Sequence, residues 1–239
     1  MTPMPKLVRR SVAGALVLFG ILALTACGAG LPGVAGPTAT PNVQTILQRV
    51  QQAKYNDATF TLNFTGSFSG TTSTGTGNGK ITKNPERADI SLTLSVSGQQ
   101  ITVESITDKA TNAAYTKISG LDLPGFDGSK WTKTDLGSSS SSLFDTSQIT
   151  DFSKDLKNLK LVGNDTVDGT KVWHITGTST AGGQNSTIDM YVTQDGNYYP
   201  KKVVVTSTGS AAGTFTLDFT SFNTGITISL PPADQVQNG

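Results

Sequence analysis

Residues that could carry out nucleophilic catalysis do not form catalytic patterns in this chain. His174 is its one histidine and Cys27 its one cysteine, whereas hydrolases of this kind pair a Ser or Cys nucleophile with a His base. Residues 66–70 (GSFSG) come nearest to a nucleophile elbow, but Phe68 stands where the nucleophile should be. His174 falls in an alternating apolar and polar segment, so we expect a surface or hydrogen-bonded histidine of a sheet. The sequence predicts a protein without enzyme activity.

Phosphate-binding and metal-binding patterns are missing as well. Residues 75–80 (GTGNGK) fit neither the dinucleotide-binding nor the P-loop spacing. They predict a glycine-rich hairpin or a bend at a barrel edge. The Cys and His clusters of a zinc site are absent, and Asp122, Asp127 and Asp135 lack the ordered spacing of a calcium loop. We expect no cofactor and no bound metal.

The cysteine itself lies where a covalent modification is expected. Lys6, Arg9 and Arg10 precede an apolar segment over residues 12–24, which has the length of a signal peptide and is short for a membrane span. Leu24-Thr25-Ala26-Cys27 then resembles the bacterial lipobox, in which cleavage before the cysteine follows diacylglycerylation of its thiol. This predicts a signal peptide over 1–26, cleavage between Ala26 and Cys27, and a lipid anchor on Cys27. The alternatives are an ordinary secretory signal with a chance cysteine, or a buried cysteine of a core helix.

The composition of the remaining chain limits the classes of partner. Residues 1–26 carry three basic and no acidic residues, which leaves 15 Lys and Arg against 17 Asp and Glu. So weak a balance gives no electrostatic reason to expect nucleic acid or an anionic bilayer surface as partner. One cysteine allows no internal disulfide, and about 200 residues suit a single domain. We expect a monomer that is attached to a membrane through lipidated Cys27. The composition does not identify a protein partner.

The periodicity of apolar residues predicts two helices and about eleven strands. Residues 27–41 are rich in Gly, Pro, Ala and Thr and predict a flexible tether with a span of roughly 20 Å. Asn42 can cap a helix that carries Val43, Ile46, Leu47 and Val50 on one face and ends near Lys54. A second helix is predicted over 146–160. Period-two alternation predicts the strands, including one over 226–230, and residues 233–239 form a tail.

Strands with one apolar face must bury that face against something. We expect an α+β, mainly β domain over 42–232, in which a curved antiparallel sheet of about eleven strands wraps around the two amphipathic helices. The residues expected on the enclosed apolar face are Phe60, Leu62, Phe64, Ile90, Leu92, Leu94, Val96, Ile149, Phe152, Leu156, Ile188, Met190, Phe215, Leu217 and Phe219.

The order of strands and turns in the C-terminal half carries a resemblance to a known family. Residues 167–177 (VDGTKVWHITG), 188–192 (IDMYV), 199–203 (YPKKV), 215–219 (FTLDF) and Pro231-Pro232 are similar to the LppX/LprG family of envelope lipoproteins. That family resembles the LolA and LolB lipoprotein carriers in fold, so the resemblance implies a half-open antiparallel β-barrel of about eleven strands wrapped around the two amphipathic helices. The resemblance implies a hydrophobic cavity that holds the acyl chains of a lipid or glycolipid, and a place in the bacterial cell envelope outside the cytoplasm.

Two functions remain open at this stage. The first is a membrane-anchored lipoprotein that binds or carries lipid in that cavity. The second is an anchored structural, interaction or regulatory module whose core is filled, because residues that line a void and residues that fill a core look alike in sequence. Leu121, Leu123 and Phe126 in the loop 119–130 are open to two interpretations as well, either as a mobile lid or membrane-touching edge, or as ordinary core that plugs the open end of the barrel.

Overall fold

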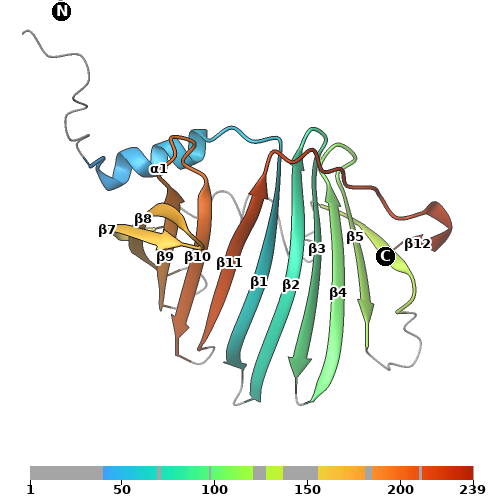
Figure 1. The fold of residues 1–239 in the computed structure, drawn as a ribbon. Helices are drawn as coiled ribbons and strands as arrows, with labels where there is room; N and C mark the ends of the chain where they lie inside the picture. The colour runs from blue at the N-terminus through green and yellow to red at the C-terminus, as the bar shows by residue number, and fades with distance from the viewer. Residues whose placement is uncertain are drawn as a thin grey trace, which may run out of the picture. The chain divides into compact units, whose positions relative to one another are not determined.

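A single large sheet dominates the computed structural model, which describes residues 40–68, 71–96, 98–120, 128–136, 156–180, 185–209 and 212–238. Pro41–Gly239 form one compact unit, and Figure 1 shows its strands side by side in a strongly curved sheet. The elements are α1 (Val43–Gln52), β1 (Asp57–Phe68), β2 (Thr71–Lys83), β3 (Glu86–Val96), β4 (Gln99–Asp108), β5 (Ala113–Ser119), β6 (Trp131–Asp135), β7 (Lys157–Val167), β8 (Thr170–Ser179), β9 (Asn185–Thr193), β10 (Pro200–Thr208), β11 (Gly213–Phe222), the 3₁₀ turn η2 (Ala233–Gln235) and β12 (Val236–Asn238).

The strands follow the order β12-β6-β5-β4-β3-β2-β1-β11-β10-β9-β8-β7. Neighbours are antiparallel, apart from the parallel pair of β12 and β6. The first strand of the chain, β1, lies in the middle of the sheet, where it pairs with β2 on one side and β11 on the other. The prediction of a mainly β domain is confirmed. The sheet has twelve strands rather than about eleven, and it does not close, because β7 and β12 remain as its two edges.

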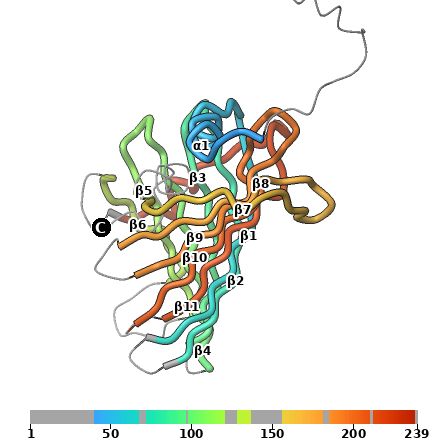
Figure 2. Tube along the Cα trace, turned by 90° about the vertical axis from the view of Figure 1, so that its left-hand side faces the viewer, coloured from blue at the N-terminus to red at the C-terminus, as the bar shows by residue number. Residues whose placement is uncertain are grey.

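Helix α1 is the one α-helix in the described residues, and it forms where the sequence predicts it. The side chain of Asn42 accepts a hydrogen bond from the backbone N–H of Thr45 at 2.8 Å, which caps the first turn. Ile46, Leu47 and Val50 are buried along one face of the helix. Figures 1 and 2 place the helix at the end of the sheet that β7–β10 form.

The predicted helix over 146–160 is wrong in its last turn. Residues 157–160 belong to β7, and the earlier part of that segment lies outside the described residues. A register shift between Lys157 and Lys160, with Asn158 at a φ of +53°, places Leu156 and Leu159 together against the core. A bulge in a strand can therefore place two apolar residues three positions apart on the same face, as Leu156 and Leu159 are, and so produce the spacing that is typical of a helix.

Residues 226–230, predicted as a strand, have no strand partner. They are extended, and the backbone oxygen of Ile228 accepts a hydrogen bond from Nη1 of Arg87 at 2.8 Å. The side chain of Ile228 packs in a small cluster with Ile106, Tyr115 and Trp131. The chain then enters β12, which the sequence pattern did not predict and which pairs with β6 through Val236 and Trp131. The segment after β11 thus attaches the C-terminal part of the chain to the β4–β6 end of the sheet, through side-chain packing and strand pairing.

Asp108 positions Arg87, which in turn binds the backbone of the C-terminal segment at Ile228. The side chain of Asp108 is fully buried, and its carboxylate accepts hydrogen bonds from Arg87 Nη2 (3.3 Å), Thr111 Oγ1 (3.0 Å) and the N–H of Ala110 (3.1 Å). Burial favours the neutral acid, but the hydrogen bonds from Thr111 and Arg87 and the charge of Arg87 outweigh it and hold the pKa of Asp108 below its usual value.

We expect Asp108→Asn to lower the free energy of unfolding by about 1–3 kcal/mol at pH 7, because it leaves the Arg87 guanidinium without its counter-charge. A carboxyl whose pKa is lowered in the folded state stabilises the fold above its unfolded pKa of about 4, and this contribution is lost as the pH falls through the folded pKa. Urea unfolding at pH 7 and pH 3 should therefore show a difference between wild type and variant that shrinks in acid. An equal difference at both pH values would contradict this role of the carboxylate.

Candidate functional site

The strand register brings the predicted apolar residues onto one face of the sheet. Across β1 and β11, Phe60, Leu62 and Phe64 pair with Phe219, Leu217 and Phe215. Apolar residues of β3, β9 and β10 continue these rows to either side. We call this surface the apolar face, and its described members from the sequence prediction are Phe60, Leu62, Phe64, Ile90, Leu92, Leu94, Val96, Ile188, Met190, Phe215, Leu217 and Phe219.

One half of the apolar face is a filled core. Phe60, Leu62, Met190 and Phe219 are at most 2% exposed. They form one cluster with the three buried residues of α1 and with Ile90, Ile175, Ile188, Val203 and Leu217. We call this part the packed half. Its side chains contact one another and the helix, which leaves them no free surface for a ligand.

The other half of the face is more open. Phe64, Leu92, Leu94, Val96 and Phe215 are only partly buried. These residues lie further along their strands than the buried residues of the packed half, and Ile101, Ile118 and Val205 extend the same rows on β4, β5 and β10. Phe215 and Val205 lie at the border, because they also pack against the cluster of the packed half. Beyond them the rows end in small or polar residues, including Ser186 and Ser207, whose hydroxyls lie 2.8 Å apart. We call this part the open half; it combines accessible apolar side chains with a polar rim.

Three glycines of β2 divide the face between β1 and β3. Gly75, Gly77 and Gly79 stand opposite Phe64, Leu62 and Phe60, and a Cβ at Gly79 would collide with the ring of Phe60. Of the two predictions for residues 75–80, the bend at a barrel edge is wrong, since they form the middle of a central strand. That strand is one arm of the antiparallel hairpin of β1 and β2, as the glycine-rich hairpin predicts. Glycine is needed there because the side chains of the neighbouring strands lean over β2.

Gly77→Ala tests this arrangement. In a strand without such crowding, alanine would stabilise the fold by restricting the unfolded chain. Here its Cβ would collide with the backbone oxygen of Ser91, so we expect a loss of about 1–3 kcal/mol in the free energy of unfolding. Thermal unfolding of Thr76→Ala, an exposed position on the same strand, provides the control and should change little. A Gly77→Ala protein as stable as wild type would contradict the close approach of β3.

The predicted site residues outside these strands have different outcomes. Leu156 is described, and it is partly buried against the packed half. Ala26, Cys27, Ile149, Phe152 and residues 121–127 lie outside the described residues.

His174 lies on the opposite face and has ordinary structural partners. Its Nε2 is 2.9 Å from Oδ1 of Asp189, and its ring stacks on Tyr191 at 4.5 Å between centroids. This agrees with the prediction of a hydrogen-bonded sheet histidine. The pKa of Tyr191 is raised by burial and by the charges of Asp189 and Asp165, so the phenol stays neutral.

Charged pairs also gather on that opposite face. Lys202 and Asp218 lie 3.2 Å apart and Lys117 and Glu104 lie 2.7 Å apart. The pKa of Asp89 is raised overall, mainly by burial. The charge of Lys80 acts against this shift, and the charge of Glu104 adds to it. Within the described ranges, no group of three or more His, Cys, Asp or Glu residues is arranged to hold a metal ion. None of the helices in those ranges combines the length and apolar character needed to cross a membrane.

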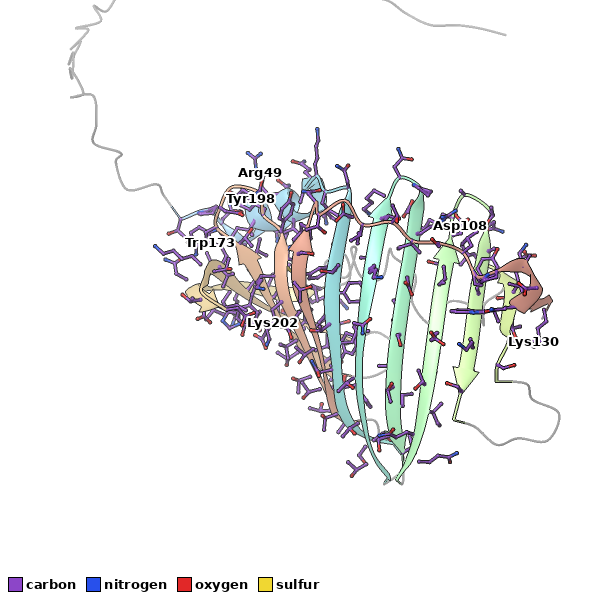
Figure 3. The ribbon with its side chains drawn as sticks, turned by 45° about the vertical axis from the view of Figure 1, so that its right-hand side comes forward. Arg49, Asp108, Lys130, Trp173, Tyr198 and Lys202 are labelled. Atoms are coloured by element: carbon purple, nitrogen blue, oxygen red, sulfur yellow. The ribbon has the colours of Figure 1, made fainter. Side chains whose placement is uncertain are left out.

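A second candidate site was not predicted from the sequence. A pocket of about 640 Å³ opens between the last turn of α1 and the loop between β9 and β10. Its lining residues are Arg49, Gln52, Ala53, Lys54, Gly196, Asn197, Tyr198 and Tyr199. Figure 3 shows Arg49 and Tyr198 close together at this end of the molecule. The turn at Asp195-Gly196-Asn197 was readable from the sequence, but its proximity to the helix end was not.

The fold is an open, curved antiparallel sheet with one apolar face, and one part of that face packs against helix α1. Two solved structures share this fold, the first of them that of a lipoprotein. LppX from Mycobacterium tuberculosis matches with 16% identity and a TM-score of 0.52, over 78% of this chain and 100% of its own. LprF from Mycobacterium bovis matches with 14% identity and a TM-score of 0.52, over 79% of this chain and 96% of its own. The resemblance expected from the sequence is confirmed as a likeness of fold.

The sequence comparisons reach less far. A family model described as "Predicted periplasmic protein (DUF2092)" matches residues 130–232, which include the segments 167–232 that carry the resemblance. No curated protein matches the chain in sequence.

Proposed function

We propose that this protein is a membrane-anchored envelope lipoprotein that binds lipid, with acyl chains lying on the open half of the apolar face. The observation that carries the proposal is the contrast between the two halves. The packed half is a filled core, whereas Phe64, Leu92, Leu94, Val96 and Phe215 keep accessible apolar surface. A binding protein needs no catalytic group for this role.

Apolar contact is the interaction that this surface offers. Burial of a methylene group is worth about 0.8 kcal/mol, so full burial of the roughly 15 methylenes of one acyl chain supplies about 12 kcal/mol, and two chains supply about 24 kcal/mol. The cost of association is about 4–15 kcal/mol, which one chain offsets over most of that range and two chains exceed. One or two acyl chains are therefore a ligand of suitable size. The match of LppX and LprF supports the proposal through the fold alone.

The anchor and the domain division are part of the proposal. Residues 1–26 act as a lipoprotein signal peptide, Cys27 carries the lipid, residues 28–41 form the tether, and residues 42–232 fold as one lipid-binding domain. The description of the matched family as periplasmic supports a location outside the cytoplasm.

Native mass spectrometry of the purified protein tests lipid binding directly. We expect a population with non-covalent adducts that dissociate on activation and that organic extraction identifies as acyl lipids. The covalent lipid on Cys27 gives a separate mass shift that survives activation. A protein that carries no non-covalent lipid, even after incubation with lipids from its own membrane, would favour the interaction module with a filled core.

A further inference from the structure

The pocket between α1 and the β9–β10 loop is built from fixed parts. The hydroxyl of Tyr199 donates to the backbone oxygen of Lys54 at 2.9 Å and accepts from Nδ2 of Asn223 at 2.9 Å. The ring of Tyr199 stacks on Phe222 at 4.3 Å between centroids. These contacts join the loop to the segment that follows the helix, so both walls of the pocket hold their positions without a ligand.

The loop that forms the outer wall is held from within. The carboxylate of Asp195 accepts hydrogen bonds from Thr193 Oγ1 at 2.8 Å, the N–H of Asn197 at 3.0 Å and Nδ2 of Asn197 at 3.1 Å. Burial acts to raise the pKa of Asp195, but these hydrogen bonds lower it overall. The carboxylate therefore serves the turn, and Asp195 is not among the lining residues.

The charges at the pocket are positive. Arg49 and Lys54 both line it and are exposed, and neither forms an ion pair with any described residue. No acidic side chain is among the residues that line it. The end of α1 contributes about half a negative charge, and the ionised carboxylate of Asp195 contributes one more from the adjacent turn. The two full cations of Arg49 and Lys54 outweigh both. The amides of Gln52 and Asn197 and the hydroxyl of Tyr198 add groups that can bind hydroxyls.

The pocket also lies within reach of the proposed anchor. Helix α1 is about 15 Å long, and it starts 16 residues after Cys27. A flexible chain of that length spans roughly 20 Å. An anchored domain can therefore bring this end of α1 to the membrane surface.

We propose that this pocket binds the anionic, hydroxyl-bearing head group of a phospholipid in the bilayer, of the phosphatidylglycerol or phosphatidylinositol class, and so seats the domain on the membrane. Arg49 and Lys54 contact the phosphate, and the amides and Tyr198 contact the hydroxyls. The inference rests on the proposed anchor at Cys27, and it is independent of lipid binding on the open half of the apolar face.

Hydrogen–deuterium exchange of the full lipidated chain in vesicles tests this docking. The protein is reconstituted into vesicles of phosphatidylcholine alone or with about 30% phosphatidylglycerol. One cation near an anionic surface changes binding about fivefold. In the phosphatidylglycerol vesicles we therefore expect exchange at residues 48–54 and 194–199 to slow about fivefold or more, and the effect to weaken at high salt.

Matched charge variants make the result specific. Arg49→Gln with Lys54→Gln should abolish the protection. Lys160→Gln with Lys171→Gln removes two exposed cations elsewhere and should leave it unchanged. Equal protection in both kinds of vesicle, or protection that survives in the first double variant, would overturn the proposal.

Two further arms separate this inference from related ones. Glycerol phosphate added to phosphatidylcholine vesicles should give no protection at millimolar concentration; full protection would make the ligand a soluble phosphate ester and overturn the bilayer source. Native mass spectrometry of the same samples reports acyl lipid on the open half. Loss of docking with bound lipid retained rejects only the head-group pocket, and the reverse result rejects only the lipid-binding proposal.

Discussion

A Leu94→Lys variant is expected to remain folded and to lose its bound lipid. Leu94 is partly buried in the open half of the apolar face, so a lysine there can extend its ammonium towards solvent at a cost of about 1 kcal/mol in stability. An acyl chain on the same surface would have to desolvate that charge, which costs far more. Lipid occupancy, measured by native mass spectrometry, should fall at least about tenfold, while the melting temperature falls by only a few degrees.

Met190→Lys is the matched variant in the packed half. Met190 is fully buried in the cluster beneath α1, where an ammonium finds no partner, so we expect a loss of several kcal/mol or a failure to fold. The pair separates the two functions left open by the sequence. If Leu94→Lys unfolds as Met190→Lys does, the open half is also a filled core, and the interaction module is the better account of the protein.

Cys27→Ala is expected to abolish lipidation entirely and to leave a precursor that keeps residues 1–26. The thiol is the one atom in the chain that can receive the diacylglyceryl group of a lipoprotein, since no other cysteine exists. At about 0.8 kcal/mol per buried methylene, several acyl chains hold a protein at a membrane far more firmly than one chain does. Metabolic labelling with a fatty-acid probe, followed by gel analysis, measures the effect.

Thr38→Ala in the proposed tether is the control for this experiment and should be labelled as wild type is. Continued labelling of the Cys27→Ala protein would mean that the anchor lies elsewhere. A wild-type protein that takes up no label, although residues 1–26 are removed, would identify an ordinary secretory signal instead of a lipoprotein one.

Most of the sheet could be predicted from local sequence, because alternation reports directly on a strand with one buried face. Residues 60–64, 90–96 and 215–219 alternate strictly, and all three lie in the strands where they were expected. Helix α1 follows from Asn42 and a stripe of three buried residues. The errors occur where the same spacing has two explanations. Leu156 and Leu159 fit a helix, yet a bulge at Asn158 gives the same side-chain placement.

The candidate sites divide in the same way. The residue types on the apolar face were readable from the sequence, but the division into a packed and an open half depends on where α1 lies, and periodicity carries no information on that. Residues 226–230 alternate like a strand, yet strand pairing depends on a neighbour with free hydrogen-bonding groups, and the described structure provides none there.

The sequence alone determined the apolar and polar faces of the strands and the capped helix, because each depends on residues near one another in the chain. It also predicts the lipidation site at Cys27, for the same reason. Only the tertiary structure shows that the sheet stays open, that the ring of Phe60 lies over Gly79 of β2, and that a pocket lies at the end of α1. A net charge near zero gave no reason to expect an anionic membrane surface as partner. The fold nevertheless places Arg49 and Lys54 in one pocket and keeps Asp195 occupied within its own turn. Local charge at a site is set by which distant segments meet, and that is a property of the packing rather than of the composition.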